Sequence, residues 1–306
     1  MAKALAKHRK IKDSFGDRVL NIITSILLVL VIIIVGYPIL FVVSSSFSSS
    51  AAVESGKVFL WPVEFSTNAY QFVLQYKSVW LGFRNTLFYT VFGVILDMVI
   101  CVLVAYPLSR PDLQGKQMYF MIFYMTTRIG AGLIPNFLLR CDLGMYNTLW
   151  AVLFPGTVSV GNILIMRTAI KSNIPGELFD AAMIDGSSHF QCMLKLAVPL
   201  TKATMSVLIL YCIVAHWNEY FNHMIYLRDN ELWPLQLVLR PIMIAASAAG
   251  AMDMSQVSSS TASMADKGLE AVRYALIVVS TVPILVVYAV VQKSFKGGVM
   301  LGSVKG

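Results

Sequence analysis

Few side chains in this sequence are placed for chemistry, and none of them forms a catalytic or metal-binding pattern. The four cysteines are scattered without a CxxC pair, which indicates neither a zinc site nor a disulfide framework. His216 and His223 have no metal-ligand partner four residues further on. The sequence also lacks the G-x-x-x-x-G-K-[ST] phosphate loop, so any ATP must bind on another chain. We therefore predict that the chain is not an enzyme and binds no metal or cofactor itself.

Two ionisable residues stand within long apolar stretches, where a charge is costly and usually faces the interior of a helix bundle. Asp97 lies 13 positions before Arg110, and Arg128 lies 12 positions after Lys116. At a rise of about 1.5 Å per residue, both reach a similar depth on neighbouring antiparallel helices. We expect either an Asp97–Arg128 ion pair or separate exposure of the two charges to a water-filled cavity.

A polar cluster near the end of a later apolar stretch is the candidate lining of a pathway between helices. Trp217, Asn218 and Glu219 are followed one turn later by Asn222. An aromatic ring can stack on the apolar face of a ligand, and amides can hydrogen-bond to its polar groups. The alternative is that these residues only pack and hydrogen-bond between helices.

The composition indicates which elements hold these residues. Apolar residues make up 57% of the 306 and charged residues 13%, and the mean hydropathy is +0.71. A soluble domain has roughly a quarter charged residues, so we predict an all-α membrane protein. The net charge of +8 does not indicate nucleic acid, because the basic residues are not interleaved with aromatic residues on a polar patch.

Six apolar stretches are long enough to cross a bilayer, which takes roughly 20 residues. These predicted spans are 19–47, 83–109, 117–139, 147–170, 200–227 and 272–291. Six spans put both termini on one side, and most of the Lys and Arg residues fall on that side. The positive-inside rule makes it the cytoplasmic side.

This topology divides the chain into three parts. They are a basic cytoplasmic arm (1–18), a six-helix transmembrane domain (19–293) and a cytoplasmic tail (294–306). Within the domain, the loop 228–271 lies outside the membrane. Its second half is small and polar with little helical periodicity, so we expect a mobile segment there.

The cytoplasmic segment 172–199 carries start and stop signals for two short helices. Pro175 suits the first turn of a helix, and Gly186 is placed to end that helix in the left-handed conformation. Ser188 and Gln191 form an S-x-x-Q capping box for a second helix. Residues spaced i, i+3, i+4 and i+7 form one face on each helix, namely Leu178, Ala181, Ala182 and Asp185, then Phe190, Met193, Leu194 and Ala197. Such a unit would pack into a groove of another protein or only shield the bundle.

The same segment resembles the EAA loop of ABC importer permeases, whose pattern is E-A-A, three residues, G, nine residues and I-x-L-P. The matching positions here are Asp180, Ala181, Ala182, Gly186, Leu196, Val198 and Pro199. The spacing is kept, while Asp replaces Glu, Leu replaces Ile and Val replaces Leu. Stretches 143–155 and 217–235 resemble the carbohydrate-type, MalG-like branch, as does the tail ending that includes Gly302, Val304 and Lys305.

The resemblance implies a MetI/MalG-like permease fold. The chain would be the permease subunit that forms half of the membrane pathway for a sugar or oligosaccharide, with a complex or acidic glycan included. Segment 172–199, called the coupling segment below, would dock in a cleft of an ATPase, with Asp180 facing a basic residue of that ATPase. The C-terminal tail would also reach the ATPase dimer.

The implied partners are a homologous MalF-like permease, two ATPase subunits that hold ATP and Mg²⁺, an extracellular sugar-binding protein and the lipid bilayer. The implied location is the cytoplasmic membrane of a prokaryote, with both termini in the cytoplasm. Two alternatives remain at this point. One is an ABC importer for another solute such as glycerol phosphate, and the other is an ion-coupled secondary transporter.

Overall fold

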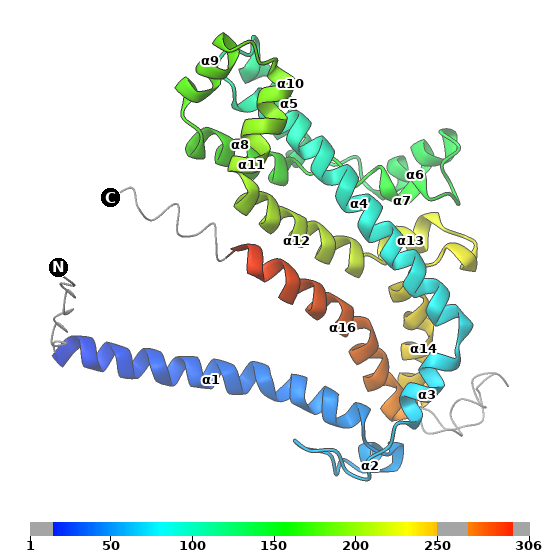
Figure 1. Cartoon of the computed structure of the whole chain (residues 1–306). Helices are drawn as coiled ribbons and strands as arrows, with labels where there is room; N and C mark the ends of the chain where they lie inside the picture. The colour runs from blue at the N-terminus through cyan, green and yellow to red at the C-terminus, as the bar shows by residue number, and fades with distance from the viewer. Residues whose placement is uncertain (1–14, 250–268, 296–306) are drawn as a thin grey trace.

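The computed structural model describes residues 15–249 and 269–295, which form helices and loops without a strand among them. The long helix α4 (Lys77–Ser109) runs through the centre of the molecule, and a group of short helices gathers at one of its ends (Figure 1). Two further long helices, α1 (Phe15–Ser46) and α16 (Leu269–Phe295), contact each other near the other end of α4. The remaining helices are α2 (Ser50–Glu54), α3 (Asn68–Gln75), α5 (Lys116–Arg128), α6 (Leu133–Asp142), α7 (Trp150–Leu153), α8 (Val160–Asn173), α9 (Gly176–Ile184), α10 (His189–Cys192), the π-helical η1 (Met193–Ala197), α11 (Val198–Leu200), α12 (Lys202–Asn218), α13 (Phe221–Tyr226), the 3₁₀-helical η2 (Asn230–Leu232) and α14 (Leu235–Ala249).

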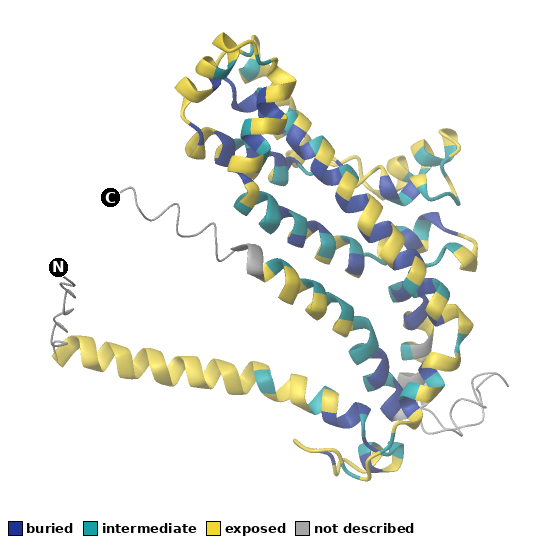
Figure 2. Cartoon of the chain, viewed as in Figure 1, coloured by how far each residue is buried: buried dark blue, intermediate teal, exposed yellow. Residues whose placement is uncertain are grey.

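Three helices within the described ranges are long and apolar enough to cross a membrane, namely α1, α4 and α16. They coincide with the first, second and sixth predicted spans. Most of α1 is exposed along its whole circumference (Figure 2), although 18 of its 32 residues are Ile, Leu or Val. A helix that is apolar on all sides and not covered by protein is stabilised by lipid, since its backbone polar groups are paired internally. The chain is therefore a membrane protein.

The third, fourth and fifth predicted spans are interrupted rather than continuous. The third is broken between α5 and α6, the fourth between α7 and α8, and the fifth between α12 and α13. Glycine and proline explain the first two breaks: Gly132 has a φ of +79°, and Pro155 and Gly156 form a turn before α8. A fourth membrane-crossing unit arises only if α12 is counted with the helices His189–Leu200, from which it is bent by 82°. Six spans remain a prediction.

The predicted external loop 228–271 contains a helix that the sequence interpretation missed. Helix α14 packs against α4 and α16, and its start is fixed by two side chains of α4. Asn85 Nδ2 donates to the backbone oxygen of Trp233 at 3.0 Å, and Thr86 Oγ1 accepts from the Leu235 backbone N–H at 2.7 Å. Only the second half of the loop was expected to be mobile, and residues 250–268 of it lie outside the described residues.

Buried side chains form two main cores at different levels along α4. One lies among α4, α8, α12 and the coupling segment, and includes Cys101, Ala105, Met166, Phe179 and Met193. The other lies among α3, α14 and α16, and includes Val73, Leu235 and Leu276 together with Trp217 at the end of α12. Helix α12 therefore contributes to both cores and connects them.

Candidate functional site

The coupling segment forms the predicted helix–glycine–helix unit. Gly186 has a φ of +84°, and the turn around it is a complete Schellman motif. The Ser187 N–H donates to the Ala182 carbonyl at 2.9 Å, and the Gly186 N–H donates to the Met183 carbonyl at 3.0 Å. A Cβ at position 186 would meet no atom within 4 Å, so glycine is favoured here by its backbone conformation and not by lack of space.

The second helix of the unit begins with the predicted capping box. Ser188 Oγ accepts from the Gln191 N–H at 3.3 Å, and Gln191 Oε1 accepts from the Ser188 N–H at 3.0 Å. The helix continues through the π-helical η1 to Leu200, one residue beyond the expected stop at Pro199. Thr201 then makes the bend into α12, where its buried Oγ1 donates to the Ala197 carbonyl at 2.6 Å.

The predicted faces of these two helices only partly match their burial. On α9 the inward residue is Phe179, which is buried, while Ala181 and Asp185 from the predicted face are exposed and Ala182 is half-buried. The second predicted face is split between two sides of the helix. Its residues Met193 and Ala197 pack into the core, whereas Phe190 and Leu194 point outward. Both helices therefore present apolar side chains away from the bundle.

The outward surface of the coupling segment combines apolar and acidic side chains. Ile184 is 86% exposed and Phe190 60% exposed, and the Asp180 side chain is 71% exposed. Leu196 of the EAA-like pattern is half-buried against the first core, and Pro199 is exposed. An exposed apolar cluster of this kind, with an acidic residue beside it, is typical of a surface that another protein covers.

Arg110 connects the coupling segment to the end of α4, a contact that the sequence interpretation missed. Its guanidinium lies 4.4 Å from the ring centre of Phe179, 3.2 Å from Asp112 Oδ1 and 3.7 Å from Asp180 Oδ1. The Arg110 side chain is only 8% exposed, because it fills the joint between α4 and α9. Asp180 is mostly in solvent, so its attraction to Arg110 contributes little stability and leaves the carboxylate available.

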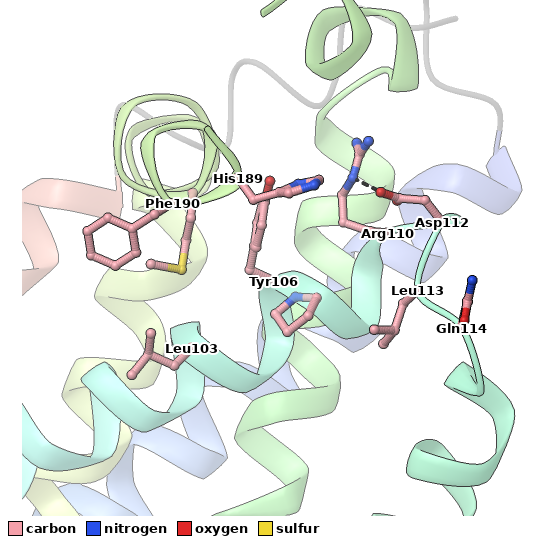
Figure 3. A pocket seen from close by; sticks show the side chains of 10 residues that line it. Leu103, Tyr106, Arg110, Asp112, Leu113, Gln114, His189 and Phe190 are labelled. Atoms are coloured by element: carbon pink, nitrogen blue, oxygen red, sulfur yellow. Dashed lines mark ion pairs between the residues drawn. The ribbon is translucent and has the colours of Figure 1, made fainter. Parts of the chain in front are cut away.

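A pocket opens beside this joint between the end of α4 and the start of α10. Its volume is about 400 Å³, and Tyr106, Arg110 and Asp112 line it opposite His189 and Phe190 (Figure 3). The neighbouring Lys116 donates to the Arg110 carbonyl at 2.7 Å. Partial burial, followed by the positive charge of Arg167, lowers the pKa of Lys116. The coupling end of the molecule is therefore basic beneath an acidic and apolar outer surface.

The predicted Asp97–Arg128 ion pair is wrong. Asp97 Oδ2 instead lies 2.9 Å from His216 Nε2 on α12. Arg128 is exposed and donates to the Tyr124 hydroxyl at 2.9 Å. Helix α5 carries Arg128 and α12 carries His216, and it is α12 that packs along α4 at the level of Asp97. Equal depth along neighbouring helices therefore did not imply contact.

The predicted pathway residues divide into two groups. Glu219 and Asn222 line a cavity of about 410 Å³ bounded by α4, α6, α7, α8, α12 and α13, called the pathway cavity below. Trp217 does not line it, because its ring is buried against Phe83 and its Nε1 donates to the Ser280 carbonyl at 3.0 Å. Asn218 is exposed outside the cavity and donates to the Val214 carbonyl at 2.9 Å. The alternative of packing is thus correct for Trp217.

The structure does not describe the predicted tail residues, and it can be searched for metal ligands only within its described ranges. Gly302, Val304 and Lys305 of the tail are outside the described residues. Within the described ranges, no group of three or more His, Cys, Asp or Glu side chains is arranged to hold a metal ion.

Comparisons with known proteins agree with this architecture. No protein-family model matches the chain. Over 269 residues it is 34% identical to YtcP, the permease protein of a polygalacturonan/rhamnogalacturonan transport system of Bacillus subtilis (strain 168), covering 88% of this chain and 92% of YtcP. Over 269 residues it is 30% identical to protein LplC of the same organism, covering 88% of this chain and 89% of LplC.

A solved structure shows the same fold. It is a crystal structure of a bacterial ABC transporter involved in the import of the acidic polysaccharide alginate, and one of its chains matches with a TM-score of 0.83 and 35% identity. The match covers 92% of this chain and 99% of that chain.

Fold and sequence together define a membrane transport permease. The chain belongs to the permease family of carbohydrate ABC importers. Membership in this family rules out the ion-coupled secondary transporter, and it assigns the chain a transport role rather than an enzymatic one.

Proposed function

We propose that this chain forms one half of the membrane pathway of an ATP-driven importer for oligosaccharides that contain uronic acid. Two relatives support this substrate class, because one belongs to a polygalacturonan/rhamnogalacturonan system and the other to a transporter of the acidic polysaccharide alginate. A homologous second permease would complete the pathway, and an extracellular binding protein would deliver the sugar. Both termini and the coupling segment would lie in the cytoplasm, as the distribution of basic residues indicates.

The observation that carries the proposal is the exposed outer surface of the helix–glycine–helix unit. Ile184 and Phe190 remain in solvent although the unit is firmly anchored to the bundle through Phe179. Full burial of one such side chain is worth about 1.5–3 kcal/mol. A cleft in each of two ATPase subunits would cover this surface, with Asp180 facing a basic residue of the cleft.

The mechanism follows from the attachment of the unit to the spans. ATP and Mg²⁺ would bind on the ATPase subunits, whose closure moves their clefts together. A unit seated in such a cleft would carry that motion into α4 through the Arg110 joint and into α12 through the Thr201 bend. The spans then exchange between two packed arrangements, one open inward and the other open outward.

Site-directed cross-linking tests the docking surface. The chain with Ile184→Cys is expressed with its partner subunits, and a short bifunctional maleimide–photoreactive reagent is attached to the new thiol. We expect cross-links to an ATPase subunit, since position 184 is 86% exposed on the proposed docking surface. Phe59→Cys is the matched control, because Phe59 is also exposed but lies in the loop after α2, at the other end of α4. Equal ATPase labelling from both positions, or none from position 184, contradicts the proposal.

Uptake by proteoliposomes that contain the complete transporter tests the substrate class. We expect ATP-dependent accumulation of trigalacturonate and little accumulation of maltotriose, a neutral sugar of the same length. Preference for maltotriose would leave the permease assignment intact and refute the uronic acid substrate.

A further inference from the structure

The pathway cavity contains a buried carboxylate that lacks a full set of hydrogen-bond donors. The Asp97 side chain is only 8% exposed. Its Oδ2 lies 2.9 Å from His216 Nε2, but its Oδ1 has no hydrogen-bond partner among the described residues. The thiol of Cys212, a weak donor, is the polar group beside it. Leaving such an acceptor without a donor costs about 1–3 kcal/mol. Because Oδ1 is itself enclosed, a small rotation of the Asp97 side chain is needed for a hydroxyl group in the cavity to supply that donor.

The position of this carboxylate is fixed by the local sequence of α4. Gly93 lies one turn before Asp97, and a Cβ at position 93 would approach the His216 ring to 2.6 Å. Only glycine therefore lets the imidazole reach the carboxylate across the α4–α12 interface. The pair is held in place before any ligand arrives, as a binding site requires.

Other groups around the cavity match the surface of a sugar ring. Asn162 Nδ2 is engaged only weakly, since it donates to Cys212 Sγ at 3.4 Å, and Tyr211 lines the cavity with an exposed ring. Amides and carboxylates pair with ring hydroxyls, and an aromatic face covers the apolar C–H side of the ring. The volume of about 410 Å³ lies within the range of small-molecule sites, roughly 300–1,000 Å³.

Arg140 adds a fixed positive charge to this lining. Its guanidinium lies 3.8 Å from the ring centre of Tyr226, and its NH1 donates to the Ala151 carbonyl at 3.2 Å. A guanidinium has five N–H donors in a planar fork that suits a carboxylate. Arg140 therefore has donors left for a carboxylate ligand, while Asp97 and Glu219 suit the uncharged hydroxyls of the same ligand.

We propose that the pathway cavity is a subsite for one uronic acid unit, in which Arg140 binds the sugar carboxylate and Asp97 and Asn162 bind ring hydroxyls. This inference rests on the proposed function, because it assigns the uronic acid substrate to a site on this chain. It goes further in placing the contact between the membrane helices and in naming the residues that distinguish an acidic sugar from a neutral one.

Protection of an engineered thiol tests the subsite directly. Ala215 lines the cavity and is exposed, so Ala215→Cys provides a reporter for a water-soluble maleimide in the complete, reconstituted transporter. We expect trigalacturonate to slow labelling at least fivefold and maltotriose to have little effect. Adding Arg140→Gln should abolish most of the protection, and Arg140→Lys should retain part of it, since a lysine keeps the charge but loses the fork. Arg128→Gln is the control, because Arg128 is equally charged but does not line the cavity.

The outcomes separate the two proposals. If the Ala215→Cys transporter accumulates trigalacturonate but the thiol is not protected, the subsite is refuted and the proposed function stands. Equal protection by maltotriose, or unchanged protection in both Arg140 variants, refutes the role of Arg140. If the unmodified transporter does not accumulate trigalacturonate, the uronic acid substrate itself is refuted.

Discussion

The conformation of Gly186 makes a quantitative prediction about coupling. At a φ of +84°, a residue with a side chain is strained by about 1–2 kcal/mol, and a β-branched residue such as valine is strained most. Because a Cβ at this position meets no atom within 4 Å, Gly186→Val adds backbone strain without a collision inside the chain. The strain falls on the turn that sets the angle between α9 and α10.

The strain translates into a measurable loss of affinity. In the free variant the strained turn relaxes to another conformation, and docking must restore the original turn at this cost. Each 1.4 kcal/mol is about tenfold in an equilibrium constant, so a cost of about 1–2 kcal/mol weakens docking by about 5- to 30-fold. The assay is the affinity of the purified permease pair for the ATPase subunits, together with uptake per ATP hydrolysed in proteoliposomes. Insertion of the spans should not change, because the cores of the bundle do not include Gly186.

Asparagine provides the matched control for this substitution. It adds a Cβ like valine, but it adopts the left-handed conformation far more readily. Gly186→Asn should therefore retain most of the affinity that Gly186→Val loses. If the Gly186→Val protein binds the ATPase subunits with an affinity within twofold of that of the unmodified protein, the turn does not control docking. If the Gly186→Asn protein binds as weakly as the Gly186→Val protein, the glycine is needed for contact with the partner and the conformational argument is wrong.

Three further predictions concern the bundle. Trp217→Ala removes a buried ring and should destabilise the protein by about 3–5 kcal/mol. The measurement is the melting temperature in detergent, which should fall. An unchanged melting temperature would place Trp217 outside the core. Gly93→Ala should displace the His216 ring and lower uptake while ATPase docking stays normal, and normal uptake would show that the ring can move at no cost. Exchanging Asp97 and Arg128 should not restore the activity lost in Asp97→Arg, and restoration would revive the ion pair that the structure lacks.

Local sequence signals predicted the capping box and the glycine turn of the coupling segment, but not which faces of its two helices are buried. The capping box, the glycine turn and the helix bounds depend on contacts within a few positions, so Ser188, Gln191 and Gly186 could be placed without a fold. The tertiary partner of Asp97 could not be, because depth along a helix leaves its rotation and its neighbour undetermined. The sequence alone does not show whether Arg128 or His216 contacts Asp97. The packing of α12 against α4 brings His216 to Asp97.

The same limit applies to the spans. Apolar length identified α1, α4 and α16, which need no more than an unbroken run of apolar residues. It could not reveal that α5–α6, α7–α8 and α12–α13 are broken helices, since the average hydropathy of a stretch is unchanged by a gap of a few residues. Helix α14 was missed for the opposite reason. This helix lies in the first half of the predicted external loop 228–271, whereas the prediction for that loop was based on its polar second half. Its start is fixed by Asn85 and Thr86 of α4, which is distant in sequence.

Helix α12 connects the coupling segment to the pathway cavity. It begins directly after the Thr201 bend of the coupling segment, and it carries His216 at the pathway cavity near its other end. Its 17 residues span about 25 Å at 1.5 Å per residue. A movement of the docked unit that rotates α12 must therefore shift His216 relative to Asp97 on α4. Under the proposed function, the hydrogen bonding of Asp97 would therefore differ between the inward-open and the outward-open arrangement of the spans.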